Sequence, residues 1–248
     1  MRTVVFLILF SGIWARAQET SLFHTGSDTG IPGFIPVIID PDGPEWPWGK
    51  CTGDLDNDGW MDLIIGGFRS GGLVYYVNPC RNLIPESSWD RVVISEEPGF
   101  STDIEVSDID GDGNLDLFCV RSNSIEWFSN PGWNSVVIDS IEGHDLEIAD
   151  FDNDRKSDLV VRNQGEFGKK GDVLFFYRQV SPGSWEGTRI PCPDGEGLKV
   201  CDLDRDGRPD VIVNGSWFRN TGNMDQWEEH SFAGDRGFRN SYIDAGDI

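Results

Sequence analysis

An aspartate-rich loop recurs along the chain and restricts the possible folds more than any other feature. Its pattern is Asp-x-Asp-x-Asp-x-x-x-Asp, and the first aspartates of successive copies are 54, 42 and 52 residues apart, with a fifth copy beginning at Asp247. This spacing is the size of one four-stranded propeller blade. The aspartates at loop positions 1, 3, 5 and 9 are Asp54, Asp56, Asp58, Asp62, Asp108, Asp110, Asp112, Asp116, Asp150, Asp152, Asp154, Asp158, Asp202, Asp204, Asp206 and Asp210.

The rest of each unit repeats as well and predicts four strands. An alternating stretch precedes the loop, a continuous apolar run follows it, an aromatic pair comes next, and a Trp with an apolar residue five positions later ends the unit. In the second unit these segments are residues 104–106, 117–120, 127–128 and 133–138. Alternation indicates a half-buried strand, and a continuous apolar run indicates a strand buried on both faces. The sequence therefore predicts an all-β propeller of four-stranded blades, with four complete blades and the start of a fifth.

The composition agrees with this fold and excludes one class of binding partner. The chain has 30 Gly and 13 Pro in 248 residues, which is typical of short strands joined by turns. Its formal net charge of −23 repels phosphate backbones and anionic membrane surfaces. We therefore exclude nucleic acid as a partner.

The first residues match an export signal. Arg2 precedes an apolar run over residues 4–13, and Ala15 and Ala17 supply the small residues before a cleavage site. We predict a signal peptide over residues 1–17 cleaved after Ala17, a linker over residues 18–32, and the propeller over residues 33–248. The apolar run is about half the roughly 20 residues that a membrane-spanning helix needs. The protein is therefore expected to be secreted, with no membrane span.

The two ends of the predicted propeller do not form complete blades. Residues 33–39 match the pattern of an outer strand, and a first strand at residues 242–248 ends two residues into its aspartate loop. We expect the chain to be a piece of a larger propeller, with these segments at the ends of an open arc or paired with each other in a partial blade.

Five cysteines in an exported chain leave at least one thiol free. Cys119 and Cys201 lie within apolar strand-like runs, so we interpret them as small buried hydrophobic residues. No pair has a Cys-x-x-Cys spacing, and no disulfide pairing follows from the sequence.

The aspartate loops have the oxygen donors that calcium prefers. Carboxylates at positions 1, 3, 5 and 9 and a carbonyl at position 7 can surround one hard cation, and a Gly at position 6 allows the turn. An EF-hand is excluded because it requires Glu at position 12, where this chain has Ile65, Cys119, Val161 and Val213. Aspartate-rich turns without an ion are the alternative, but they would leave these carboxylates repelling one another in every copy. We predict calcium as the cofactor.

One loop departs from the pattern. Arg155 stands at position 6 of the Asp150 loop, followed by Lys156 and Ser157. A side chain at this turn position strains the backbone, and the guanidinium adds a positive charge beside the aspartates. We expect this loop to be the weakest calcium site.

The loop motif between two strands, at blade-length spacing in an exported chain, resembles the FG-GAP/VCBS-type repeats over about residues 33–248. The resemblance implies a calcium-stabilised β-propeller, as in integrin α-subunit heads, some lectins and some polysaccharide lyases. It also implies that ligand sites lie on the face opposite the aspartate loops, near the start of each first strand.

The residues expected on that face vary from blade to blade. Six positions before each first aspartate stand Trp48, Thr102, His144, Glu196 and Ser241. Trp46 and Trp48 offer ring faces for a sugar, and packing within the fold is the alternative. His144 is a candidate base, and a hydrogen-bonded loop histidine is the alternative. Residues that differ from blade to blade at this position would also arise if these surface positions had no function and varied freely.

Two functions remain open from the sequence. We expect a non-catalytic, calcium-binding recognition module for a carbohydrate or protein ligand, with Trp46, Trp48, His144 and Glu196 as candidate ligand-binding residues. The alternative is the catalytic propeller of a polysaccharide lyase or related carbohydrate-active enzyme, with His144 as the candidate catalytic residue. Asn214-Gly215-Ser216 matches a glycosylation sequon.

Overall fold

The computed structural model describes residues 38–79, 89–164, 170–232 and 244–245. Within these ranges every regular element is a strand, and none forms a helix that could cross a bilayer. The expected signal peptide, the linker, Cys80, Ser241 and the start of the fifth loop at Asp247 lie outside the described residues.

The strands form four separate antiparallel sheets, each a meander of four strands taken in chain order. The first sheet contains β1 (Gly49–Gly53), β2 (Asp62–Gly66), β3 (Leu73–Val77) and β4 (Asp90–Ser95). The second contains β5 (Phe100–Ser107), β6 (Asp116–Arg121), β7 (Ser124–Ser129) and β8 (Asn134–Asp139). The third contains β9 (Gly143–Ala149), β10 (Asp158–Asn163), β11 (Val173–Ser181) and β12 (Ser184–Pro191). The fourth contains β13 (Lys199–Cys201), β14 (Asp210–Val213), β15 (Ser216–Asn223) and β16 (Gln226–Ser231).

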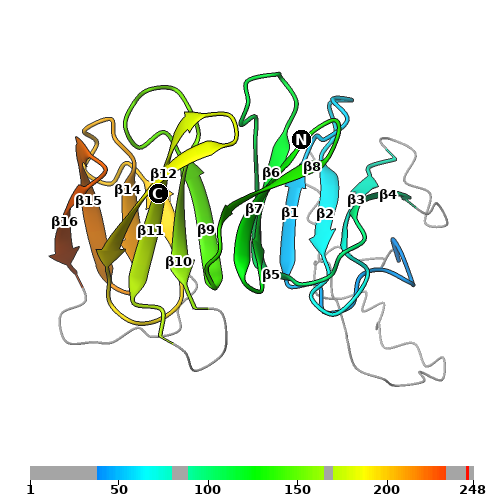
Figure 1. Ribbon diagram of the computed structural model, residues 1–248, viewed down its shortest axis with the longest axis horizontal. Coiled ribbons are helices and arrows are strands. Elements are labelled where there is room, and N and C mark those ends of the chain that lie inside the picture. The colour runs from blue at the N-terminus through cyan, green and yellow to red at the C-terminus, as the bar shows by residue number, and fades with distance from the viewer. Residues whose placement is uncertain (1–37, 80–88, 165–169, 233–243, 246–248) are drawn as a thin grey trace, which may run out of the picture.

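This arrangement confirms the all-β blade architecture predicted from the repeat. Each second strand begins at the position 9 aspartate of its loop, and these strands are almost wholly buried, as their continuous apolar runs predict. The innermost strands pack in the order β1, β5, β9 and β13. Figure 1 shows the four sheets side by side, with the first and fourth at opposite ends.

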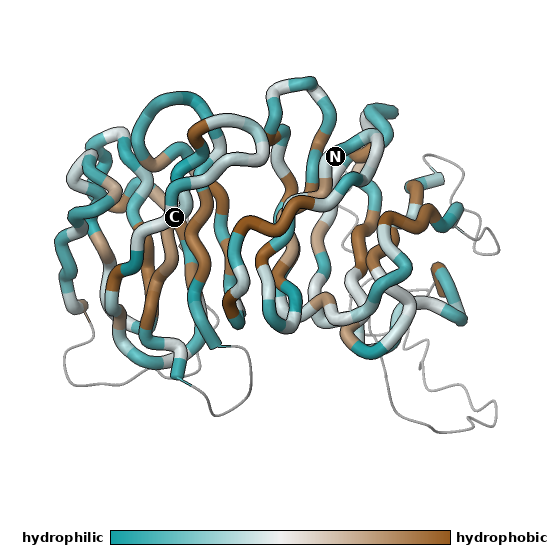
Figure 2. Tube along the Cα trace, viewed as in Figure 1, coloured by the Kyte–Doolittle hydropathy of each residue, from teal (hydrophilic) through white to brown (hydrophobic). Residues whose placement is uncertain are grey.

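Three hydrophobic cores lie between neighbouring blades and hold the sheets together. The residue at loop position 2 is buried in each of them: Leu55, Ile109 and Phe151 pack against strands of their own blade and of the next one. In Figure 2 the hydrophobic segments lie within the sheets, and the connecting loops are mostly hydrophilic. The equivalent Leu203 of the fourth blade is 45% exposed, because no further sheet of the described chain packs on it.

The cysteines of the described residues are free thiols. Cys119 is buried in the core between the first two blades, as predicted, whereas Cys201 is only partly buried. Burial raises the pKa of Cys192 to about 11, so little of this thiol is ionised at neutral pH.

Candidate metal sites and the opposite face

The four aspartate loops join the first strand of each blade to the second, which places all of them at the same end of the sheets. In every loop, three carboxylates bring one oxygen each within 4.8 Å of the other two. Three loops bring together positions 1, 3 and 5, while the Asp150 loop brings together positions 1, 3 and 9. The donors are hard carboxylate oxygens in the pattern that suits calcium, so the residues fit the predicted ion.

Backbone hydrogen bonds make the carboxylates converge. In the first loop, Asp54 accepts hydrogen bonds from the backbone N–H groups of Asp58 at 3.0 Å and Gly59 at 2.9 Å. Asn57 and Gly59 both have positive φ, which turns the chain around the aspartates. Arg155 occupies the equivalent of Gly59 in the third loop with a φ of 69°, the left-handed conformation that disfavours a side chain. The turn strain expected at Arg155 is therefore present.

The position 9 aspartates are structural anchors as well as candidate ligands. Asp62, Asp116, Asp158 and Asp210 are buried, and each accepts backbone N–H bonds at both carboxylate oxygens. Burial raises the pKa of all four, and that of Asp158 to about 6. A carboxylate has about four lone-pair sites, so two N–H bonds leave each one able to bind a cation.

An amide side chain after each aromatic pair completes this anchor, and the sequence analysis did not assign it a role. Asn130, Gln179 and Asn220 each donate a backbone N–H to the position 9 aspartate of their own blade. Their side-chain amides donate to the position 2 carbonyl of the preceding blade, at 2.8 Å in each case. The signal was visible, because Asn or Gln follows every aromatic pair by two residues.

Basic side chains contact the aspartates of the third and fourth loops. Lys156 pairs with Asp154, and Arg208 pairs with Asp206. The guanidinium of Arg219 lies 2.6 Å from the carboxylate of Asp204. A hydrogen bond from Lys156 lowers the pKa of Asp154, although burial opposes it, and a hydrogen bond from Arg219 lowers that of Asp204.

An aromatic platform lies at the other end of the first blade. Trp46 and Trp48 precede β1 and stack on Phe68, which follows β2, with centroid distances of 6.2 and 4.6 Å. The two indoles are 46% and 44% exposed, and the guanidinium of Arg69 lies 5.6 Å from the Trp46 ring centre. The backbone N–H of Phe68 donates to the Trp46 carbonyl at 3.1 Å, and that of Arg69 donates to the Glu45 carbonyl at 3.3 Å, which fixes the two segments together. The three rings pack on one another, and the two indoles still expose a large apolar area to solvent.

His144 and Glu196 lie in the third and fourth blades, and no described contact joins them to the platform. The Nδ1 atom of His144 lies 3.1 Å from the carboxylate of Asp145. Burial alone lowers the pKa of His144, but Asp145, with Glu196 and Asp103, raises it above its ordinary value. No hydrogen bond or ring contact described for this chain joins a tyrosine to His144, and Tyr76 and Tyr177 donate instead to Asp40 and Asp139. The described residues thus place His144 against Asp145 and near other acidic groups.

The sequence analysis did not predict the acidic row, which we define as Asp103 and Glu105 of β5 and Glu147 of β9. Asp103 accepts the backbone N–H of Leu146 at 2.9 Å, which ties β5 to β9. Two residues further along β5, Glu105 lies near Asp103, Glu147 and Lys199. Burial raises the pKa of Asp103 to about 7 and that of Glu105 to about 8, and neighbouring carboxylates add to both shifts. These carboxyl groups are therefore expected to titrate near neutral pH.

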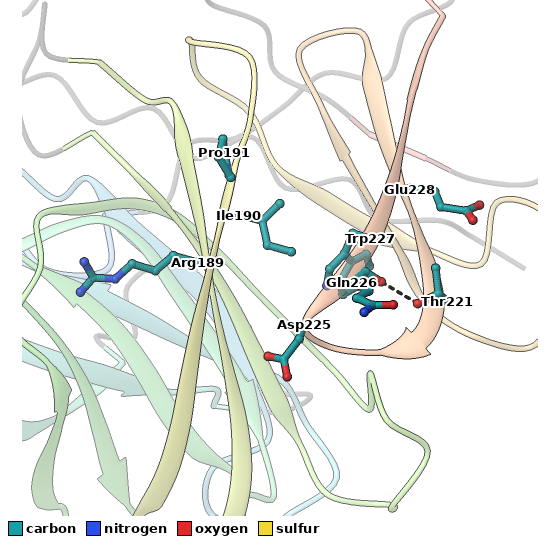
Figure 3. A pocket seen from close by; sticks show the side chains of 8 residues that line it. All are labelled: Arg189, Ile190, Pro191, Thr221, Asp225, Gln226, Trp227 and Glu228. Atoms are coloured by element: carbon teal, nitrogen blue, oxygen red, sulfur yellow. Dashed lines mark hydrogen bonds between the residues drawn. The ribbon is translucent and has the colours of Figure 1, made fainter.

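A groove separates the outer strand of the third blade from the β15–β16 hairpin of the fourth. Figure 3 shows Ile190 on one wall and Trp227 on the other, with Thr221 hydrogen-bonded to Gln226. The indole N–H of Trp227 donates to the Met224 carbonyl, and its ring stacks on Phe176 at 4.4 Å. Trp227 and Thr221 are thus already engaged in contacts within the fold.

Asn214 of the sequon is buried. Its side-chain amide donates to the Asp194 carbonyl at 2.8 Å, and its oxygen accepts from Arg162 at 3.0 Å. The described fold therefore does not present this asparagine as a glycan acceptor.

Comparison with known proteins finds similar repeats over part of the chain. The family model of the FG-GAP-like repeat matches residues 108–161 and 150–213, which include the second, third and fourth aspartate loops. Cartilage acidic protein 1 of Mus musculus is 23% identical over 139 residues, a match that covers 47% of this chain and 22% of that protein. The chain therefore spans less than a quarter of that relative.

A solved structure shares the fold. An Agrocybe aegerita lectin, described for its recognition of non-reducing terminal N-acetylglucosamine, aligns with a TM-score of 0.50 and 16% identity. The alignment covers 76% of this chain and 52% of the lectin. At this identity the likeness concerns the fold alone.

Proposed function

Starting from the FG-GAP-like repeats that this chain carries, we propose that the protein is a secreted β-propeller module that binds calcium in its aspartate loops and recognises a carbohydrate or protein ligand. The observation that carries the calcium proposal is the convergence of three carboxylates at four equivalent turns. A bound calcium ion would neutralise this charge. The aspartates would hold the ion, and the position 9 aspartates would connect it to the buried cores.

The ligand surface is proposed at the platform of Trp46, Trp48 and Phe68. Exposed aromatic rings bury apolar area at little entropic cost, and Arg69 with Glu45, paired at 3.8 Å, supplies polar contacts at the rim. The rings present the flat apolar faces that suit the ring face of a sugar. The lectin fold supports a binding role for this module without naming its ligand.

Calcium is expected to stabilise the protein, and Asp110→Ala should reduce this effect more than Asp152→Ala. An ion that binds only the folded state adds RT ln(1 + [Ca]/Kd), about 1.4–2.7 kcal/mol per site at 10 mM calcium for a Kd of about 10⁻³ to 10⁻⁴ M. Asp110 belongs to a loop with glycine at position 6, and Asp152 belongs to the strained Arg155 loop. Thermal melts of each variant in calcium and in EDTA measure the difference. Coinciding wild-type melts would remove the metal from the proposal.

Replacing both Trp46 and Trp48 by alanine is expected to reduce ligand binding at least tenfold, because the stacked rings form most of the exposed apolar area of the platform. A glycan panel, screened with calcium and with EDTA, identifies the probe sugar, and the same panel then tests the variants. Trp60→Ala is the matched control, since Trp60 is 39% exposed but lies in an aspartate loop at the other end of the blade. Equal losses in both variants would argue against a binding surface at the platform.

A further inference from the structure

The four aspartate loops fall into two pairs when the repeat units are aligned. Two positions distinguish the pairs: loop position 7, and the third-strand residue just before the repeated Asn or Gln. The first two units carry neutral residues at both positions, and the last two carry basic residues at both. Unit by unit, the residues are Trp60 and Val77, Asn114 and Ser129, Lys156 and Arg178, and Arg208 and Arg219.

In the fourth blade these two basic residues surround the loop carboxylates. Arg219 reaches Asp204 at 2.6 Å and Asp206 at 3.0 Å, and Arg208 pairs with the same oxygen of Asp206. On the outer strand, Glu228 lies 3.5 Å from Arg219 and opposite it in register. The two guanidinium groups therefore lie on the carboxylates that would otherwise bind a cation.

The third blade repeats this arrangement with one substitution. Lys156 replaces the first arginine and pairs with Asp154, and Arg178 lies 3.9 Å from Asp152. Glu186 stands opposite Arg178 on the outer strand and pairs with it. The same three-residue arrangement thus occurs in two blades, which makes an accidental surface contact a poor explanation.

The second loop provides the contrast. Its aspartates form no ion pair with a basic side chain in the described part of the chain, and Asn114 at position 7 contributes a neutral amide. Hydrogen bonds from N–H groups reach these carboxylates, but no described positive charge offsets their mutual repulsion, so a bound cation would stabilise this loop most.

We propose that the basic pairs of the third and fourth blades are built-in counter-ions. The Asp150 and Asp202 loops keep their folded conformation without a metal ion and bind calcium more weakly than the Asp108 loop, because the carboxylates at positions 3 and 5 must first lose their basic partners. This inference rests on the proposed calcium binding, and it assigns a stronger metal dependence to the Asp108 loop than to the loops of the third and fourth blades.

Counting bound calcium tests the inference. Equilibrium dialysis should show one tightly bound ion fewer for Asp110→Asn and an unchanged number for Asp204→Asn. The double variant Arg208→Gln/Arg219→Gln should gain one tight site. The inference is overturned if Asp204→Asn loses an ion of the same affinity as the one lost by Asp110→Asn.

Melts in EDTA give a second readout that does not need bound metal. Arg208→Gln/Arg219→Gln should lower the Tm by about 2–4 °C, since the loop loses its counter-ions, and calcium should restore it. Arg189→Gln is the control, because Arg189 is exposed and lies over Phe175 instead of an aspartate loop. A wild-type protein that binds no calcium would refute the proposed function, whereas an unchanged Tm of the double variant in EDTA would refute the counter-ions.

Discussion

Arg162→Met is expected to destabilise the fold by about 3–5 kcal/mol. Arg162 is the largest fully buried side chain of the described chain, and it has no carboxylate partner there. Its guanidinium donates to the Gly171 carbonyl at 2.8 Å, the Gly197 carbonyl at 2.7 Å, the Pro193 carbonyl at 2.5 Å and the Asn214 side chain. Methionine fills similar volume but removes every one of these hydrogen bonds, and it leaves the Gly197 carbonyl and the Asn214 side-chain oxygen without their described donor.

Urea unfolding measures this loss, and Arg189→Met is the matched control. Arg189 lies on the exposed outer strand, so its replacement should cost less than about 1 kcal/mol. Arg162→Lys keeps the charge with three donors in place of five, and it should recover only part of the stability. A loss below 1 kcal/mol for Arg162→Met would show that the acceptors are satisfied without it. If the methionine variant does not fold, the lysine variant still shows how much of the stability depends on the five hydrogen-bond donors and how much on the positive charge.

The repeat made the architecture predictable from sequence. Position 9 aspartates such as Asp116 mark the start of each second strand, and the Trp–Ile spacing of Trp133 and Ile138 marks the outer strand. Because each blade repeats these signals, a segment that is ambiguous in one repeat can be assigned from the equivalent segments of the others. The structural role of Asn130 was equally visible, since an amide follows every aromatic pair, and only its partner in the preceding blade required coordinates.

Residues that differ between blades could not be interpreted in this way. Arg162 aligns with Gly66, Val120 and Asn214 of the other blades, so no periodic signal marks it. Its role depends on the carbonyls that two neighbouring blades present to one buried point. The basic residues did follow a pattern, but Arg219 meets Asp204 only because β15 returns beside the loop. Arg155 drew the attention of the sequence analysis, while the described ion pairs of its loop come from Lys156 and Arg178.

The free energy of unfolding is expected to fall as pH rises from 6 to 9, because of Asp103 and Glu105 on β5. The charged groups that face these two carboxyl groups are Glu147 of β9 and Lys199 of β13, and Asp145 also faces Asp103. Cys51 of β1 lies beside them. Burial raises the pKa of Asp103 to about 7 and that of Glu105 to about 8, well above the values of the unfolded chain. The folded state therefore binds more protons between about pH 4 and 8, and stability is lost as pH rises through the folded pKa values.

Each unit of pKa shift corresponds to about 1.4 kcal/mol, and solvent around the partly exposed Glu105 reduces the total, so we expect a loss of about 3–5 kcal/mol. The acid side has the opposite sign. The pKa values of Asp154 and Asp204 are lowered by their basic partners, so their contribution disappears as pH falls through those values. Stability should therefore be greatest at mildly acidic pH.

Glu105→Gln separates this effect from other pH-dependent changes. The amide has the shape of the protonated acid and cannot ionise, so the variant should match the wild type near pH 5.5 and exceed its stability at pH 9. Glu97→Gln, an exposed glutamate in the loop before β5, should leave the pH profile unchanged. Urea titrations in EDTA across this range give the comparison without the pH dependence of metal binding. Two results would contradict a protonated carboxyl group on β5: a wild-type free energy of unfolding that rises from pH 6 to 9, or the same pH dependence for Glu105→Gln and the wild type. The acidic side chains would then be ionised and solvated in the folded protein.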